Sequence, residues 1–143
     1  DHRQAFRWTA ASGLYLIPSL GTHAEAKGMT TDGMTVVGGY GFTAPFDPSE
    51  EYIWNAALGT VRLPTYLASL GLNLSGWNLR EVMAISPDGS AIAGHGSFNG
   101  ATVSWVVTNI PGPGTPLMGL GGLAALSLQR KRSIWNGRPA PRA

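Results

Sequence analysis

The feature that most constrains this chain is an internal repeat. Residues 5–18 ("AFRWTAASGLYLIP") align with residues 51–64 ("EYIWNAALGTVRLP"), which matches Trp8 with Trp54 and Pro18 with Pro64. Segments that recur at a period of about 20–50 residues form repeated supersecondary units, and each unit buries its apolar face against the next. The fold is therefore expected to be an array of similar units.

A second pair of segments extends the repeat. Residues 29–41 ("MTTDGMTVVGGYG") align with residues 85–97 ("ISPDGSAIAGHGS"), at a larger offset than the first pair. The larger offset predicts an insertion in the second unit, around residues 66–75. The repeat body, residues 1–109, then divides into units of about 4–50 and 51–109, and "ATVSW" at residues 101–105 marks a third start.

Local patterns predict antiparallel β structure in both units. Alternation of apolar and polar residues is typical of a strand with one buried face. Asp32-Gly33 and Asp88-Gly89 predict hairpin turns, because glycine accepts positive φ and aspartate accepts hydrogen bonds from its own backbone. About four strands per unit is the size of a propeller blade, and two units are too few to close a ring. The fold class is mainly β, with propeller-like antiparallel repeats.

The inserted stretch contains one predicted helix. Residues 64–72 ("PTYLASLGL") begin with proline and carry glycine near their end, which is the expected placement of both residues in a helix. Trp77 follows in the insertion and has no counterpart in the first unit. Its ring is a candidate for stacking on a sugar or a partner surface, and a core position is the alternative. By contrast, the equivalent positions of Trp8, Trp54 and Trp105 predict core packing.

Composition and charge exclude several classes of function. There is no cysteine, so thiolate metal sites, cysteine nucleophiles and disulfides are excluded, which suits an oxidising exterior. Five of the ten basic residues lie after residue 129, so residues 1–129 carry five basic against eight acidic groups, a net charge of −3. The high pI of 9.3 therefore reflects the tail and predicts no nucleic-acid partner.

Residue types that carry chemistry are sparse. The histidines His2, His23 and His95 do not have metal-ligand spacing, and no serine stands in a nucleophile-elbow motif. The acidic stretch at residues 46–51 ("FDPSEE") is expected to be a solvated loop, with weak binding of a cation as the alternative. We therefore predict no catalytic residue, no metal site and no cofactor.

The repeat resembles the HAF repeat of bacterial extracellular proteins over roughly residues 4–107. That repeat has an Ala-Phe-Arg-Trp start, a Leu-Gly pair and a core around Asp-Gly. The resemblance implies export and a β-rich repeat fold without implying an enzymatic activity. The matching residues are Ala5, Phe6, Arg7, Trp8, Leu20, Gly21, Gly28, Asp32, Gly33, Val37 and Gly38, and then Ile53, Trp54, Ala84, Ile85, Ser86, Asp88, Gly89, Ile92 and Gly94.

The tail differs from the body. Residues 116–128 ("PLMGLGGLAALSL") carry no charge and precede the basic cluster Arg130, Lys131 and Arg132. We predict a single short apolar helix, about 20 Å long if the whole segment is helical, against a hydrocarbon core of about 30 Å. Basic residues after an apolar segment favour the cytoplasmic side of a membrane. A buried core helix is the alternative.

Residues 110–132 resemble the PEP-CTERM sorting signal, which combines a short motif, an apolar helix and a basic end. The resemblance implies an exosortase-type membrane protease as a partner and a transient anchor through residues 116–128, and residues 133–143 are expected to be a disordered tail. The motif position is occupied by Pro111, Gly112, Pro113, Gly114 and Thr115, where Gly112 replaces the usual glutamate.

Together these features predict a non-enzymatic exported protein of the bacterial cell surface or extracellular matrix. The sequence is interpreted as the C-terminal piece of a longer precursor, which would carry the export signal. The alternative is a carbohydrate- or ligand-binding β-propeller that forms the non-catalytic part of a larger secreted enzyme. Extracellular polysaccharide is the partner that this alternative predicts.

Overall fold

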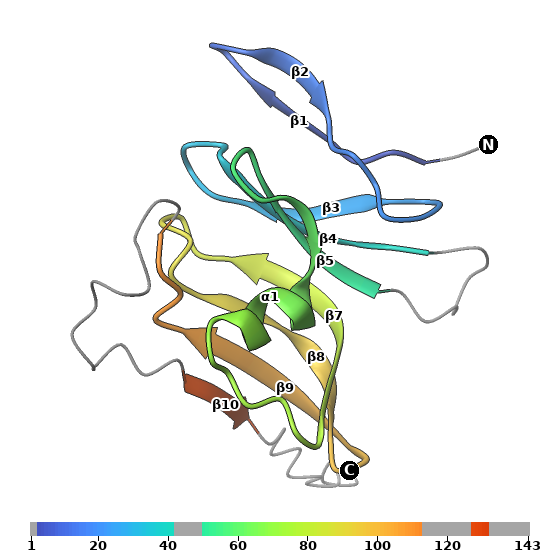
Figure 1. Cartoon of the computed structure of the whole chain (residues 1–143), viewed down its shortest axis with the longest axis vertical. Coiled ribbons are helices and arrows are strands. Elements are labelled where there is room, and N and C mark those ends of the chain that lie inside the picture. The colour runs from blue at the N-terminus through green and yellow to red at the C-terminus, as the bar shows by residue number, and fades with distance from the viewer. Residues whose placement is uncertain (1–2, 42–49, 113–126, 132–143) are drawn as a thin grey trace, which may run out of the picture.

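The computed structural model describes residues 3–41, 50–112 and 127–131, and this part of the chain is mainly β (Figure 1). One short helix, α1 (Leu63–Ser69), interrupts the described strands. The strands are β1 (Phe6–Thr9), β2 (Gly13–Leu16), β3 (Glu25–Met29), β4 (Thr35–Tyr40), β5 (Glu50–Asn55), β6 (Gly59–Arg62), β7 (Trp77–Ile85), β8 (Ile92–Phe98), β9 (Ala101–Thr108) and β10 (Ser127–Lys131).

The described strands form three antiparallel sheets. The N-terminal sheet is the hairpin β1–β2, the middle sheet has the order β3-β4-β5-β6, and the C-terminal sheet has the order β10-β9-β8-β7. The sheets follow one another along the long axis of the molecule, with the middle sheet between the other two (Figure 1). The described sheets do not close into a ring.

The main core lies between the middle and C-terminal sheets. The helix α1 adds two fully buried leucines to it, and Pro64 stands at the start of this helix, where a proline interrupts no helical hydrogen bond. Burial of a large apolar side chain contributes roughly 1.5–3 kcal/mol, and this cluster has more buried members than the other described cluster. Its buried members are Val37, Ile53, Leu63, Leu67, Leu72, Leu79, Val82, Ile92, Trp105, Val107 and Ile110.

A smaller core lies between the N-terminal and middle sheets. It contains two alanines and fewer large aliphatic side chains than the main core, so less apolar surface is buried there. Its members are Ala5, Ile17, Ala24, Val36, Tyr40, Tyr52 and Trp54. Among the described residues, the middle sheet therefore packs on both faces, while the other two sheets each pack on one.

The Asp-Gly turns are confirmed as hairpin turns. Gly33 has φ +68° between β3 and β4, and Gly89 has φ +77° between β7 and β8. In the first turn Asp32 Oδ1 accepts hydrogen bonds from Thr30 Oγ1 at 2.6 Å and from the Met34 N–H at 2.9 Å. The aspartate thus replaces missing backbone partners in the turn, as local turn chemistry requires.

Two further glycines of the repeat allow a close approach of side chain to backbone. A Cβ on Gly38 would meet the Glu25 carbonyl oxygen and lie 2.9 Å from a ring carbon of Tyr52. A Cβ on Gly94 would meet the carbonyl oxygen of Glu81 and, at 2.5 Å, the Trp105 ring. These matched positions therefore need glycine because a carbonyl oxygen of the preceding strand, and then an aromatic ring of the next strand, occupy the space of a Cβ.

The sequence units and the sheets have different boundaries. The unit at residues 4–50 supplies both strands of the N-terminal sheet and the first hairpin, β3–β4, of the middle sheet. The landmarks Trp8, Trp54 and Trp105 place β1, β5 and β9 in equivalent positions. Each complete sheet thus joins the end of one sequence unit to the start of the next.

The tail departs from the prediction in its described part. Residues 127–131 form β10, which pairs antiparallel with β9, so the helix predicted through residue 128 is wrong at its last two positions. The physical reason is that β10 supplies hydrogen-bond partners to an edge of β9 that would otherwise lack them. Residues 116–126 of the predicted helix, and residues 133–143, lie outside the described residues.

Candidate functional site

The two turn aspartates have structural partners. The pKa of Asp88 is lowered to about 2, most strongly by the hydrogen bond from the Ser86 side chain and further by hydrogen bonds from Ser90. Hydrogen bonds from Thr30 and Met34 likewise lower the pKa of Asp32. A carboxylate held in its charged form by turn donors is a poor general base at neutral pH. Across the described residues, no cluster of three His, Asp or Glu side chains is placed to hold a metal ion.

A row of polar residues crosses the outer face of the C-terminal sheet. Glu81, His95 and Ser104 are cross-strand neighbours on β7, β8 and β9, and His95 Nδ1 lies 3.2 Å from Ser104 Oγ. These residue types occur in hydrolase triads. Here the glutamate and histidine are exposed side chains on a sheet face, whereas substrate sites are typically clefts that bury most of the ligand. We assign no catalytic role to this row.

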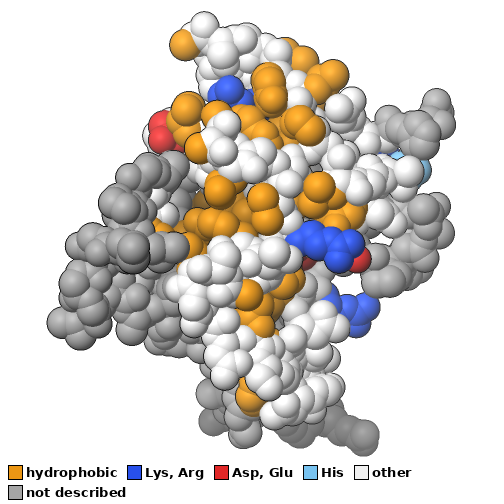
Figure 2. Space-filling model, in the orientation of Figure 1, with side chains coloured by type: hydrophobic (Ala, Val, Ile, Leu, Met, Phe, Trp, Pro, Cys, Tyr) orange, Lys and Arg blue, Asp and Glu red, His pale blue; other side chains and the backbone are white. Residues whose placement is uncertain are grey.

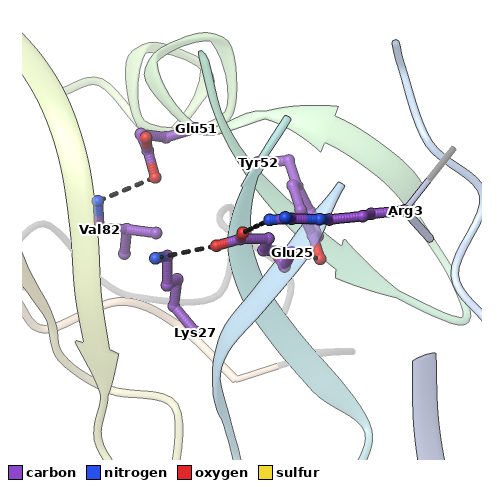
Figure 3. Close-up of polar contacts among 6 residues, drawn as sticks. All are labelled: Arg3, Glu25, Lys27, Glu51, Tyr52 and Val82. Atoms are coloured by element: carbon purple, nitrogen blue, oxygen red, sulfur yellow. Dashed lines mark hydrogen bonds and ion pairs between the residues drawn. The ribbon is translucent and has the colours of Figure 1, made fainter. Parts of the chain in front are cut away.

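A network of charged side chains joins the N-terminal segment to the middle sheet (Figure 3). Glu25 lies between two cations, with its Oε1 3.4 Å from Arg3 Nη1 and its Oε2 3.1 Å from Lys27 Nζ. The Tyr52 hydroxyl donates to the backbone carbonyl of Glu25 at 3.1 Å. Burial, together with the nearby Glu51 charge, raises the pKa of Tyr52, so its hydroxyl stays protonated as a donor.

The two described residues of the acidic stretch, Glu50 and Glu51, begin β5 and are divided between surface and core. Glu50 is exposed and pairs with Arg62 Nη2 at 2.8 Å. Glu51 is 2% exposed, and its Oε2 accepts a hydrogen bond from the Val82 N–H at 2.8 Å (Figure 3). The prediction of a loop is therefore wrong for Glu50 and Glu51, which lie in β5, and that of solvation is wrong for Glu51, which joins the middle sheet to β7. Residues 46–49 of the stretch lie outside the described residues. Strand alternation explains the difference, because adjacent residues on a strand point to opposite faces.

Trp77 is partly engaged in packing. Its ring lies against Phe98, its cross-strand partner, with 4.8 Å between ring centroids, and it packs on the main core. One face of the ring is therefore covered by the protein. Ligand stacking by Trp77 stays a prediction.

An exposed apolar surface lies instead on the N-terminal sheet. We call it the hairpin face. It consists of two cross-strand pairs, Phe6 with Leu16 and Trp8 with Leu14, and all four side chains are more than half exposed. Figure 2 shows hydrophobic side chains gathered over this end of the molecule.

Sequence reasoning missed the hairpin face because the equivalence of Trp8 with Trp54 and Trp105 predicted a core position for all three rings. That prediction is confirmed for Trp54 and Trp105, which are buried. It is wrong for Trp8, which is 61% exposed. The repeat pattern therefore identified the strand that carries each ring but not what lies against it.

The opposite face of the same hairpin packs on the middle sheet. The Arg7 guanidinium lies 5.3 Å from the Tyr15 ring centroid and 5.0 Å from the Trp54 ring centroid. Both distances are within the range of cation–π attraction. Arg7 Nη1 also donates to the Gly33 carbonyl at 3.1 Å, while Nε is buried without a hydrogen-bond partner among the described residues. An arginine between aromatic rings thus holds the hairpin on the middle sheet, in addition to the smaller core.

The predicted sorting residues are described only in part. Pro111 and Gly112 follow β9, and Arg130 and Lys131 lie in β10. Within the described ranges no helix has the length and apolar character to cross a membrane. The other members of the motif and cluster, Pro113, Gly114, Thr115 and Arg132, lie outside the described residues.

Comparisons with protein-family models, with characterised proteins and with solved structures find no match to this chain. The assignment of a function therefore rests on the residues and geometry described above.

Proposed function

We propose that this chain is a non-enzymatic exported protein of the bacterial cell surface or extracellular matrix, built from propeller-like β repeats. One observation carries the proposal: the same Asp-Gly hairpin, with the same glycine under an aromatic ring, recurs in two four-stranded sheets. The polar residues that recur have structural uses in these turns. This pattern supports a scaffold, and it agrees with the resemblance to the HAF repeat.

The tail is proposed to act as a sorting signal. In this proposal an exosortase-type membrane protease recognises residues 111–115, the apolar residues 116–128 anchor the chain transiently, and Arg130, Lys131 and Arg132 stay on the cytoplasmic side. Strand β10 sets a condition on this proposal, because residues 127–131 pair with β9 in the folded C-terminal sheet. Anchoring therefore requires that β10 is released or not yet paired.

Intact-mass measurement tests the sorting proposal. The chain, carried by an export signal, is produced in a host with an exosortase, and removal of the tail near Pro113 is expected. Replacing Arg130, Lys131 and Arg132 by serine should reduce membrane retention and block processing. The matched control replaces Arg138 and Arg142, which lie outside the cluster, and should process normally. A mature chain that still ends at Ala143 and is soluble in the cytoplasm would contradict the proposal.

Binding of a carbohydrate is the second candidate, and the exposure of Trp8 favours it. An exposed indole offers a flat apolar surface with a polar N–H. Binding of the chain to a polysaccharide array is the test, with Trp8→Ala and Trp77→Ala compared separately. Loss with one variant, while the far-ultraviolet circular dichroism is unchanged, identifies the ring that binds. No binding by the unmodified chain would remove this candidate.

A further inference from the structure

Strand β1 has an unpaired edge that its equivalents lack. In the middle sheet β5 pairs with β6 on one side and β4 on the other, and in the C-terminal sheet β9 lies between β10 and β8. Among the described strands, β1 pairs with β2 alone. The Ala5 carbonyl accepts from the Ile17 N–H at 2.9 Å. Antiparallel alternation therefore directs the backbone groups of Phe6 and Trp8 away from β2.

A groove of about 270 Å³ runs beside this edge. One wall is β1 itself, and the floor belongs to the middle sheet, chiefly to β3. One of the floor side chains, Met29, is 44% exposed. The lining residues are Phe6, Arg7, Trp8, Ala26, Lys27, Gly28, Met29 and Val36.

The neighbouring interface shows what covers such a surface. Between the middle and C-terminal sheets, the hairpin β3–β4 lies against β7, the strand equivalent to β3. The same hairpin also pairs with β5, the strand equivalent to β1. Between the N-terminal and middle sheets no described residues form the corresponding hairpin, and the groove occupies its place. Among the described strands, the interface between the middle and C-terminal sheets therefore has this hairpin. The interface between the N-terminal and middle sheets has only the strands β1 and β2 on its N-terminal side.

We propose that this groove docks an antiparallel β-hairpin of the same repeat, which pairs with the free edge of β1 and lies across β3. The added hairpin would complete the N-terminal sheet to four strands. Its backbone would satisfy the edge groups of Phe6 and Trp8, and a carbonyl near Arg7 would supply an acceptor for the buried Nε. The proposal is independent of the export proposal.

The sheet topology also indicates where the hairpin comes from. In both complete sheets the hairpin with the Asp-Gly turn precedes, along the chain, the strands that it pairs with. Both Asp-Gly pairs of residues 1–143 are already used, in the turns at Asp32 and Asp88. The occupant in this proposal is therefore a further repeat hairpin ahead of β1 on the same polypeptide.

A second copy of the chain, stacked head to tail, fits this end poorly. In such a stack, the outer face of the second copy's C-terminal sheet would contact β1, and this face carries the row of Glu81, His95 and Ser104. Covering Phe6 and Trp8 with that row would bury charged and polar groups away from water, which is costly unless new partners are supplied. A hairpin with the alternation of β3–β4 has no such cost, because its counterpart already packs this way on β7.

Fusion of a repeat hairpin to the full chain tests the proposal. A second copy of the sequence of residues 24–41 is joined ahead of Asp1 through a flexible Gly/Ser linker of about nine residues. We expect amide hydrogen exchange at Phe6 and Trp8 to slow at least tenfold and the thermal midpoint to rise. The control fusion carries the same residues in scrambled order and should leave both amides at their original exchange rates.

Two further measurements keep the result decisive. Phe6→Pro removes an edge-facing N–H, so it should abolish most of the gain in the fusion while changing the unfused chain little. If the fusion aggregates, a synthetic peptide of residues 24–41 is titrated onto the unfused chain, and saturable protection of the same amides is expected. Unchanged exchange in both experiments would overturn the proposal. So would an unfused chain that is dimeric with Phe6 and Trp8 already protected, because the second copy would then be the occupant.

Discussion

The N-terminal and C-terminal sheets place the tryptophans of two equivalent strands, β1 and β9, in opposite environments. Trp8 on β1 is 61% exposed, whereas Trp105 on β9 is 0% exposed. Each is followed along the chain by a strand that pairs with its own, so the local structure is alike. The difference lies in the adjacent sheet: the middle sheet covers Trp105, and nothing among the described residues covers Trp8. In a repeat fold the neighbour, rather than the residue, decides burial.

Substituting these two tryptophans should give the largest contrast. Trp105→Ala is expected to lower the free energy of unfolding by about 3–5 kcal/mol, because it removes the largest fully buried side chain of the main core. Trp8→Ala is expected to change it by less than about 0.5 kcal/mol, since the ring is mostly in water. Urea denaturation of both variants measures the difference. Equal losses would show that the hairpin face is covered in solution.

Gly33→Val should weaken the N-terminal interface. Gly33 has φ +68°, and an added Cβ would lie 2.8 Å from Thr9 Cγ2 on β1. A β-branched residue resists this positive φ, so we expect a loss of about 2–3 kcal/mol by thermal unfolding. Gly13→Val is the control, because Gly13 also has positive φ but has no atom near the added Cβ. If Gly13→Val loses as much stability as Gly33→Val, the loss comes from the positive φ alone and not from the contact with β1.

Glu51 tests the interface between the middle and C-terminal sheets. Glu51→Ala leaves the buried Val82 N–H without its acceptor and should cost about 1–3 kcal/mol. Glu50→Ala removes an exposed pair with Arg62 and should cost less than about 1 kcal/mol. Chemical denaturation at neutral pH measures both variants. A larger loss with Glu50→Ala would contradict the assignment of Glu51 as the link between sheets.

The smallest expected effect is on how the stability of the C-terminal sheet depends on pH. The pKa of Asp88 is depressed from 3.8 to about 2, so its contribution to stability is present above about pH 4 and is lost as the pH falls toward 2. Asp88→Asn should therefore make the thermal midpoint depend less on pH between about pH 4 and pH 2. Asp32→Asn should act in the same direction in the middle sheet, because the pKa of Asp32 is also lowered. If the thermal midpoint of both variants depends on pH as it does in the unmodified chain, the hydrogen bonds in the turns do not stabilise the charged form of the carboxylates.

Turn chemistry allowed part of the fold to be predicted from the sequence. Asp32-Gly33 and Asp88-Gly89 marked two hairpins, and the helix predicted from residue 64 to residue 72 is observed as α1 (Leu63–Ser69). The candidate surface could not be predicted in the same way. The hairpin face was assigned to the core through Trp8, and the buried role of Glu51 was missed, because both depend on which sheet lies opposite.

Local signals and distant contacts therefore determined different properties of this protein. The sequence by itself determined the turns, the β class and the repeat, because an Asp-Gly turn and strand alternation act over a few neighbouring residues. The tertiary structure decided that Trp105 is buried and Trp8 is exposed, and that Ser127–Lys131 add a strand to β9. Burial and strand pairing depend on surfaces contributed by residues far along the chain, and no local pattern contains that information.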